Sequence, residues 1–216
     1  NIVKGVEVDG NLYSCDAVVI ATGGLSYPST GSTGDGYEFA QKAGHTITPL
    51  FPSLTALMPK NYLKGVAGLT LKNIGLKLFV VDDLVQEERG DIEFTNNGIE
   101  GSLGFRLSRR AVKAMINGNR CLLTLDLKPA IGYDELAERI SKEQYRGWEA
   151  NLKEILRAYL PFNLIPYFMK DNNLPIKVED VRANKPFPNF LAHLLKSWEM
   201  EILSFTSYER AVVTAG

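Results

Sequence analysis

Alternating apolar and polar positions at the start of the chain predict a β-hairpin that leads into a buried strand. Asp9-Gly10 lies between two alternating segments and is a strong two-residue turn signal. The run from Asp16 to Ile20 then becomes continuously apolar, as in a parallel strand covered on both faces. Small residues follow, and a helix from about Tyr37 to Ala43 is expected to end at Gly44. The segment therefore predicts a strand, a glycine-rich connection and a helix.

After Pro52 the pattern changes to that of a small antiparallel sheet or barrel. The expected strands are Leu69–Val81, Val85–Arg89, Ile92–Thr95 and Cys121–Leu127. Before the last of them, the glycine-rich stretch Gly98–Gly104 leads into a helix from about Phe105 to Ile116. Several short strands separated by turn residues favour a β-rich, barrel-like unit.

A helical pattern follows from about Tyr133 to Met169, interrupted twice by proline. A further helix is expected from about Phe190 to Trp198, because four apolar residues fall at i, i+3, i+4 and i+7 on one face. These residues are Leu191, Leu194, Leu195 and Trp198. Strand character returns from Ile202 onward. The pattern predicts a small helical part between β-rich segments.

Composition and charge limit the classes of molecule that the protein is expected to bind. With 45% apolar residues and a formal net charge of −1, the 216-residue chain has enough apolar content for a core but no overall field for nucleic acid or an anionic membrane. No apolar run approaches the roughly 18 residues of a membrane span. Cys15 and Cys121 match no metal or redox spacing, and we expect buried thiols in a reducing cytoplasm. We therefore expect a cytoplasmic protein with a small-molecule substrate, without a metal site and without a nucleic-acid or membrane partner, of open oligomeric state.

Two groups of small residues could contact a ligand. The first, Ala21 to Gly24, ends the predicted buried strand, and ligands of open α/β sheets bind beyond the carboxyl ends of strands. The second, Gly31 to Gly36, opens the predicted helix, where free N–H groups attract anions and polar atoms. No lysine follows these glycines, as a P-loop would require. Taken separately, the first group is also typical of a tight turn, and the second of an N-capped loop.

Together the two groups resemble a known class of flavoproteins. Asp16–Gly24 followed by Ser32–Tyr37 is similar to flavoproteins with two dinucleotide-binding domains. With Leu25–Pro28 and Ala43–Thr46 added, the chain resembles the HI0933-like family of FAD-dependent oxidoreductases. The resemblance is high over residues 15–58, looser around residues 94–101, and resumes over residues 211–216.

The resemblance implies an α+β fold in several parts: one edge of a Rossmann-like FAD-binding domain, interrupted by a β-barrel-like insert with a small helical subdomain. The implied segments are a partial FAD/NAD(P)-binding domain at 1–51, a β-rich insert at 52–129, a helical subdomain at 130–177, a return through the insert at 178–206 and a returning strand at 207–216. The family's N-terminal Gly-x-Gly-x-x-Gly unit and C-terminal flavin-covering segment have no counterpart here. We therefore expect an internal piece of a longer protein that binds no FAD by itself; an opening strand-like run without methionine favours the same interpretation.

The resemblance also implies where FAD would lie in the full-length protein. The implied cofactor contacts are Ala21, Thr22, Gly23, Gly24, Gly34, Asp35 and Gly36. Further along, relatives tend to have Thr-His before a Gly-Leu-Ser-Gly-Pro turn, whereas this chain has Thr95-Asn96 before Gly98–Ser102. A histidine acid therefore cannot be assigned, and no catalytic residue is named. Asn96 and Glu100 are candidate substrate contacts, or plain turn residues.

A basic stripe follows on the next predicted helix. Arg106, Arg109, Arg110 and Lys113 share one face at i, i+3, i+4 and i+7. The stripe is either a solvated surface or a patch for an anionic substrate or for the phosphates of NAD(P)H. Arg106 and Arg109 are the residues that we take as candidate substrate contacts.

The resemblance implies that the parent protein is an FAD-dependent oxidoreductase with NAD(P)H as candidate donor. The insert would shape the substrate pocket, and the piece by itself would be inactive. Two alternatives stay open. One is a non-catalytic substrate-capping or partner-binding module. The other is an unrelated α/β binding protein with a coincidental glycine-rich loop.

Overall fold

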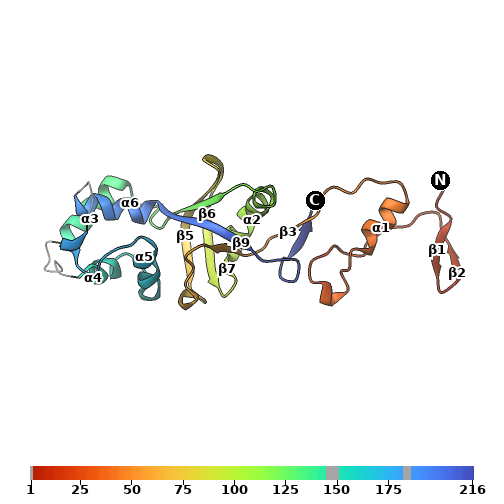
Figure 1. Cartoon of the computed structure of the whole chain (residues 1–216), viewed down its shortest axis with the longest axis horizontal. Helices are drawn as coiled ribbons and strands as arrows, with labels where there is room; N and C mark the ends of the chain where they lie inside the picture. Colours follow the sequence, from red (N-terminus) through yellow and green to blue (C-terminus); the bar gives the residue numbers. More distant parts are fainter. Residues whose placement is uncertain (1, 145–150, 182–185) are drawn as a thin grey trace. The chain divides into compact units, whose positions relative to one another are not determined.

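The computed structural model describes residues 2–144, 151–181 and 186–216. The chain divides into two compact units, which can be followed by colour in Figure 1. The first unit comprises Asn1–Ser53 and Ser207–Gly216, and the second comprises Leu54–Thr206. The first unit is therefore built from both ends of the chain, with the second inserted between them.

The first unit contains the expected hairpin and helix. Strands β1 (Gly5–Val8) and β2 (Asn11–Ser14) pair antiparallel around Asp9-Gly10. Both turn residues have positive φ, 51° and 77°, as a two-residue hairpin turn requires. Helix α1 (Asp35–Lys42) begins two residues before the expected start and ends ahead of Gly44. Gly44 has a φ of 95°, which confirms the glycine C-terminal cap.

The predicted buried strand from Asp16 to Ile20 is wrong for this chain. These residues form no strand, and Val19 is 87% exposed. A strand covered on both faces needs neighbouring strands, and no described residue pairs with it. Cys15, which we expected to be buried, is exposed for the same reason. Elsewhere in the unit, β3 (Phe51–Ser53) pairs antiparallel with β10 (Val213–Ala215).

The second unit is built on a closed six-stranded barrel, which confirms the barrel-like expectation. Its strands, in spatial order β4-β7-β6-β5-β8-β9, are antiparallel neighbours throughout, and β4 pairs with β9 to close the barrel. The strand bounds are β4 (Leu57–Pro59), β5 (Thr70–Val80), β6 (Asp83–Thr95), β7 (Gly98–Glu100), β8 (Cys121–Asp126) and β9 (Trp198–Phe205). Closure leaves the sheet without open edges.

The interior of the barrel follows the two-residue alternation of its strands. Leu76 and Leu78 on β5 lie opposite Leu125 and Leu123 on β8, and all four are fully buried. The alternation is interrupted once on β5, where Asn73 adopts a φ of 52° at a register shift. Pairing with β5 along its length, across two register shifts, explains why β6 is one strand of 13 residues rather than the two short strands expected.

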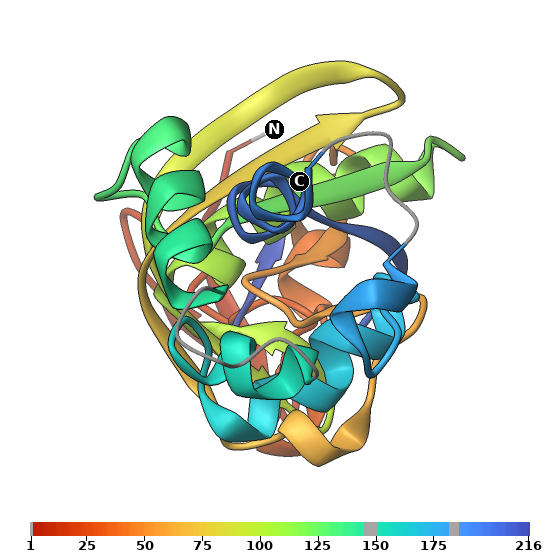
Figure 2. The same ribbon diagram turned by 90° about the vertical axis from the view of Figure 1, so that its left-hand side faces the viewer.

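Among the described residues of the second unit, five α-helices accompany the barrel. Helix α2 (Gly101–Ile116) begins four residues before the expected start and packs against β6. The others are α3 (Tyr133–Gln144), α4 (Leu152–Arg157), α5 (Ile165–Asp171) and α6 (Phe187–Lys196). They gather at one end of the barrel, on the side that faces the viewer in Figure 2. The expected helical stretch 133–169 includes residues 145–150, and the expected return 178–206 includes residues 182–185; both short segments lie outside the described residues.

An aromatic cluster joins these helices to the barrel. Trp198 at the start of β9 contacts Tyr167 and Phe168 of α5, with ring centroids 5.2 and 5.1 Å apart. Its indole N–H donates to Asp171 Oδ2 at 2.8 Å. Trp198 was expected to end the preceding helix, but α6 stops at Lys196. Such edge-to-face contacts favour a fixed position of the helices on the barrel.

Candidate functional site

In the first unit, the two glycine-rich groups lie against each other. Gly36, in the first turn of α1, is so close to the segment before it that an added Cβ would overlap the side chain of Thr22 and come within 2.9 Å of Ile20 Cγ2. Gly34 has a φ of 88°, and an added Cβ would meet Leu25 Cδ2 at 2.6 Å. The helix start and the Ala21–Gly24 segment therefore form one packed corner, which requires glycine at both places.

Thr214 of β10 completes this corner. Its hydroxyl accepts hydrogen bonds from the N–H groups of Leu25 and Ser26, at 2.7 and 3.1 Å. A Cβ added to Gly24 would meet Thr214 Oγ1 at 2.6 Å, so the close approach again depends on glycine. We did not assign a role to Thr214 from the sequence. The available signal was its place in the stretch 211–216, where the family resemblance resumes.

Burial separates the predicted cofactor residues into two sets. Gly34 and Gly36 are buried, and the Cβ positions of Gly24, Gly34 and Gly36 are taken by the chain's own side chains. By contrast, the backbone from Ala21 to Gly23 is exposed, as is Asp35. Within the described part of the chain, no residue from 17 to 24 makes a backbone hydrogen bond. The corner therefore exposes a stretch of backbone with small side chains, Ala21 to Gly23, which we call the backbone wall. The buried glycines Gly34 and Gly36 pack against the neighbouring segment.

Such a wall fits a flat cofactor. Gly23 has a φ of 79°, and a Cβ at this position would lie 3.0 Å from Ser32 Oγ. A larger residue would therefore be strained in its backbone and crowded against the neighbouring loop. The corner resembles the second half of a strand–turn–helix ligand site, in which the helix start faces the ligand.

In the second unit, two of the four candidate substrate residues, Asn96 and Glu100, belong to the hairpin formed by β6 and β7. Asn96 is exposed at the turn, and Glu100 is half-buried directly before α2. Asn97 Nδ2 donates to Glu100 Oε1 at 3.4 Å. Gly98 has a φ of 122°, and a Cβ there would overlap the carbonyl of Leu57 on β4. The tight pairing of β7 with β4 thus requires glycine in this turn.

Tyr62 stabilises the turn between β6 and β7 through hydrogen bonds. Its hydroxyl donates to the carbonyl oxygen of Thr95 at 2.6 Å and lies 3.4 Å from that of Gly98. Burial, and next the negative charge of Glu100, raises the pKa of Tyr62 to about 12. The phenol is therefore a neutral donor at physiological pH. Tyr62 was not predicted from the sequence, because its partners are 33 and 36 residues away.

The basic stripe on α2 is partly neutralised. Arg106 Nε lies 2.7 Å from Glu88 Oε2 of β6, and Arg110 donates to the carbonyl of Val85. Arg109 is exposed and makes no hydrogen bond or ion pair with the described residues. Of the two arginines that we took as substrate contacts, Arg109 is thus the one whose guanidinium is free, and Arg106 stabilises the packing of α2 on β6.

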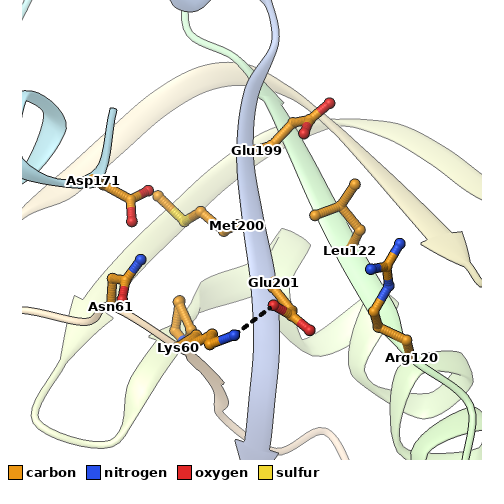
Figure 3. A pocket seen from close by; sticks show the side chains of 9 residues that line it. Lys60, Asn61, Arg120, Leu122, Asp171, Glu199, Met200 and Glu201 are labelled. Atoms are coloured by element: carbon orange, nitrogen blue, oxygen red, sulfur yellow. Dashed lines mark hydrogen bonds and ion pairs between the residues drawn. The ribbon is translucent and has the colours of Figure 1, made fainter. Parts of the chain in front are cut away.

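A pocket of the second unit lies elsewhere, on the outer face of β8 and β9 (Figure 3). It has a volume of about 370 Å³ and is lined by several charged residues but by none of the predicted site residues. Lys60 forms an ion pair with Glu201 at 3.2 Å across it. Asp171, at its rim, accepts the Trp198 indole N–H. These charges are largely satisfied within the fold.

Among residues 2–144, 151–181 and 186–216, no three side chains of His, Cys, Asp or Glu come together as a metal site. In the same residues, no helix combines the length and the apolar character that a membrane crossing needs. Cys121 is buried, as expected, and burial raises the pKa of its thiol, so it is an unreactive core residue.

Comparison with known proteins finds distant relatives that match nearly the whole chain. The chain is 24% identical over 98% of its length to a 3-dehydro-bile acid delta(4,6)-reductase from Clostridium scindens, of which it covers 52%. It is 26% identical over 98% of its length to a ribosomal RNA dihydrouridine synthase from Haemophilus influenzae, and 22% identical to one from Escherichia coli. It covers 50% of each of these two. The chain thus spans about half the length of the curated relatives it matches.

The barrel and its helices carry the family assignment. The HI0933-like protein barrel and H2TH domain matches residues 51–213, which include every strand of the barrel and helices α2 to α6. This match covers well over half of the chain and agrees with the closed barrel and its attached helices. The chain belongs to the HI0933-like family.

Proposed function

We propose that the protein containing this chain is an FAD-dependent oxidoreductase in which the Ala21–Gly24 corner forms part of the flavin wall. The observation that carries the proposal is the exposed, small-residue backbone of Ala21 to Gly23, braced by Gly36 and Thr214. Bound FAD would supply the hydride chemistry. The chain's own contribution would be to position the cofactor through backbone contacts and to exclude bulky side chains from its face.

The second unit would shape the substrate pocket. The turn at Asn96, the carboxylate of Glu100 and the free guanidinium of Arg109 offer polar contacts on one hairpin and the helix that follows. Tyr62 would act as a positioning residue, because it fixes the turn through the carbonyl of Thr95. We assign no proton donor here, since Asn96 has no titrating group.

The reaction class that we propose is reduction of an unsaturated ring with NAD(P)H as donor. In that reaction a hydride and a proton add across a carbon–carbon double bond, and the nicotinamide is oxidised. One relative is named a reductase, and two are named for dihydrouridine, a reduced pyrimidine. The names favour ring reduction over amine or alcohol oxidation.

The same names leave two substrate classes to be distinguished. A net charge of −1 favours a small molecule, whereas two relatives are named for ribosomal RNA. When NADPH is added to the full-length protein without oxygen, the visible absorbance of the oxidised flavin should disappear. Addition of a substrate that accepts the electrons should restore this absorbance. Steroid enones and unmodified ribosomal RNA fragments are the acceptors to compare. A protein without bound flavin would contradict the proposal.

A further inference from the structure

The outer face of the barrel carries a second pocket, which the proposed function does not use. Because Leu76 points into the barrel, its neighbour Gly75 belongs to the outer face. In the strand register Gly75 lies opposite Arg89 on β6 and Asp126 on β8. A pocket of about 310 Å³ lies over these residues and is bounded by α6. Gly75 leaves the floor of this pocket without a side chain.

The acidic groups of this pocket are already engaged. Asp126 Oδ2 lies 2.8 Å from Lys196 Nζ, and Asp126 Oδ1 accepts the N–H of Lys128 at 2.9 Å. Lys196 also donates to the carbonyls of Lys128 and Ile131, at 2.9 and 2.8 Å. These contacts use all three N–H donors of the Lys196 ammonium group. Lys196 and Asp126 therefore brace the pocket wall and are not available to a ligand.

The remaining charge in the pocket is positive. Lys77 lies 3.4 Å from Glu87, so this pair is nearly neutral. Arg89 and His193 also line the pocket, and within the described part of the chain neither side chain has a hydrogen-bond or ion-pair partner. An unpaired guanidinium and an imidazole that line the same recess favour an anion over a cation or an apolar ligand.

Two hydroxyl groups add neutral donors. Thr124 on β8 and Ser197 after α6 line the same pocket, and neither hydroxyl is used within the described residues. An anion with several oxygens could therefore bond to a guanidinium and to hydroxyl groups at once. A phosphate group has enough oxygen atoms to accept hydrogen bonds from the guanidinium and from both hydroxyl groups, whereas a carboxylate has only two oxygen atoms.

We propose that this pocket binds the phosphate group of a small ligand, with Arg89 as its principal contact and Thr124 as a neutral donor. The proposal does not depend on the flavin reaction, and its test reads binding alone. The 216-residue chain, labelled with ¹⁵N, is titrated with inorganic phosphate and separately with AMP, at constant ionic strength set by chloride. The backbone amides of Gly75 and Thr124 are the reporters.

Both probes should give saturable shifts at Gly75 and Thr124. Arg89→Gln should weaken binding about tenfold, as expected for loss of one charge-assisted pair. Thr124→Val should weaken it by a smaller factor. The matched control is Arg120→Gln, which removes an exposed arginine of the same unit outside this pocket. If AMP binds more tightly than inorganic phosphate, the adenosine group contributes to binding. If the two affinities are equal, the pocket recognises the phosphate group alone.

Three results would overturn the proposal: shifts that rise linearly without saturation, shifts confined to other residues, or equal weakening by Arg89→Gln and Arg120→Gln. Arg89 is exposed, so its replacement should not unfold the barrel. An unchanged amide spectrum outside the pocket checks this directly.

Discussion

The hydroxyl of Thr214 accepts the backbone N–H of Leu25 at 2.7 Å, although 189 residues separate the two in the chain. The bond joins the last strand of the first unit to the segment that directly follows the predicted flavin contacts. The insert of 153 residues, Leu54–Thr206, is accommodated between the two partners. The bond makes the geometry of the corner depend on both ends of the chain.

Replacing Thr214 with valine should therefore loosen the corner. Valine keeps the shape but removes the acceptor of the Leu25 and Ser26 N–H groups, which we expect to cost about 1–2 kcal/mol of local stability. Hydrogen exchange at the two amides is the measurement, and it should become faster. Thr33→Val is the control, because Thr33 is exposed and its hydroxyl has no partner among the described residues. Unchanged exchange in the Thr214 variant would contradict the role assigned to it.

Gly23→Val should lower the FAD content of the full-length protein. The substitution places a β-branched side chain at a φ of 79° and on the proposed cofactor wall. Gly44→Val is the matched control, since Gly44 has a φ of 95° with open space around it and lies at the far end of α1. The flavin-to-protein absorbance ratio should fall for the first variant and stay near the parental value for the second. Equal ratios would remove the local support for a flavin wall.

Tyr62 should make stability fall at high pH. Burial raises the pKa of Tyr62 to about 12, above the ordinary tyrosine value of 10.0. The neutral phenol is favoured by folding, so its contribution is fully present below pH 10 and is lost as pH rises through about 12. Denaturant midpoints measured from pH 9 to 11.5 should fall less steeply for Tyr62→Phe than for the parent.

The comparison needs an exposed tyrosine as control. Tyr13 on β2 is 62% exposed, and Tyr13→Phe should leave the pH profile unchanged. At neutral pH, Tyr62→Phe should itself cost about 1 kcal/mol, through loss of the bond to the Thr95 carbonyl. Parallel profiles for the parent and Tyr62→Phe would show that this phenol does not titrate above its usual range.

The unit Leu54–Thr206 should fold without the rest of the chain. Its barrel closes on itself, and the buried core around Leu76 and Trp198 comes from within the unit. A protein trimmed to residues 54–206 should show one cooperative thermal transition by calorimetry and retain its near-ultraviolet circular dichroism. A broad thermal transition together with strong binding of a hydrophobic dye would indicate a molten globule. It would show that residues 54–206 do not fold independently.

Local patterns determined several elements correctly. Asp9-Gly10 predicted the hairpin, because Asp and Gly readily adopt the two positive φ angles of a type I′ turn, which suits a two-residue connection. Alternation on β5 and β8 predicted strands, since one face of each strand is buried in the barrel interior. The helical spacing of Leu191 and Leu195 predicted the buried face of α6. All of these depend on neighbours within a few residues.

Other features depended on partners far along the chain. Trp198 matches the helical spacing of α6, yet pairing with Leu125 places it on β9, because interstrand bonds outweigh a weak local preference. The apolar run at Asp16–Ile20 has strand character but no neighbouring strand among the described residues, so it forms no strand and is exposed.

The candidate site divides in the same way. The sequence by itself predicted a ligand contact at the glycine-rich groups of residues 21–24 and 31–36, because glycine tolerates positive φ and close backbone approach better than other residues. Only the tertiary structure decided that Gly36 packs on Thr22, that Thr214 caps Leu25, and that Tyr62 holds the turn at Thr95. Contacts between residues so distant in the chain form only when the whole fold closes, and no local pattern encodes them.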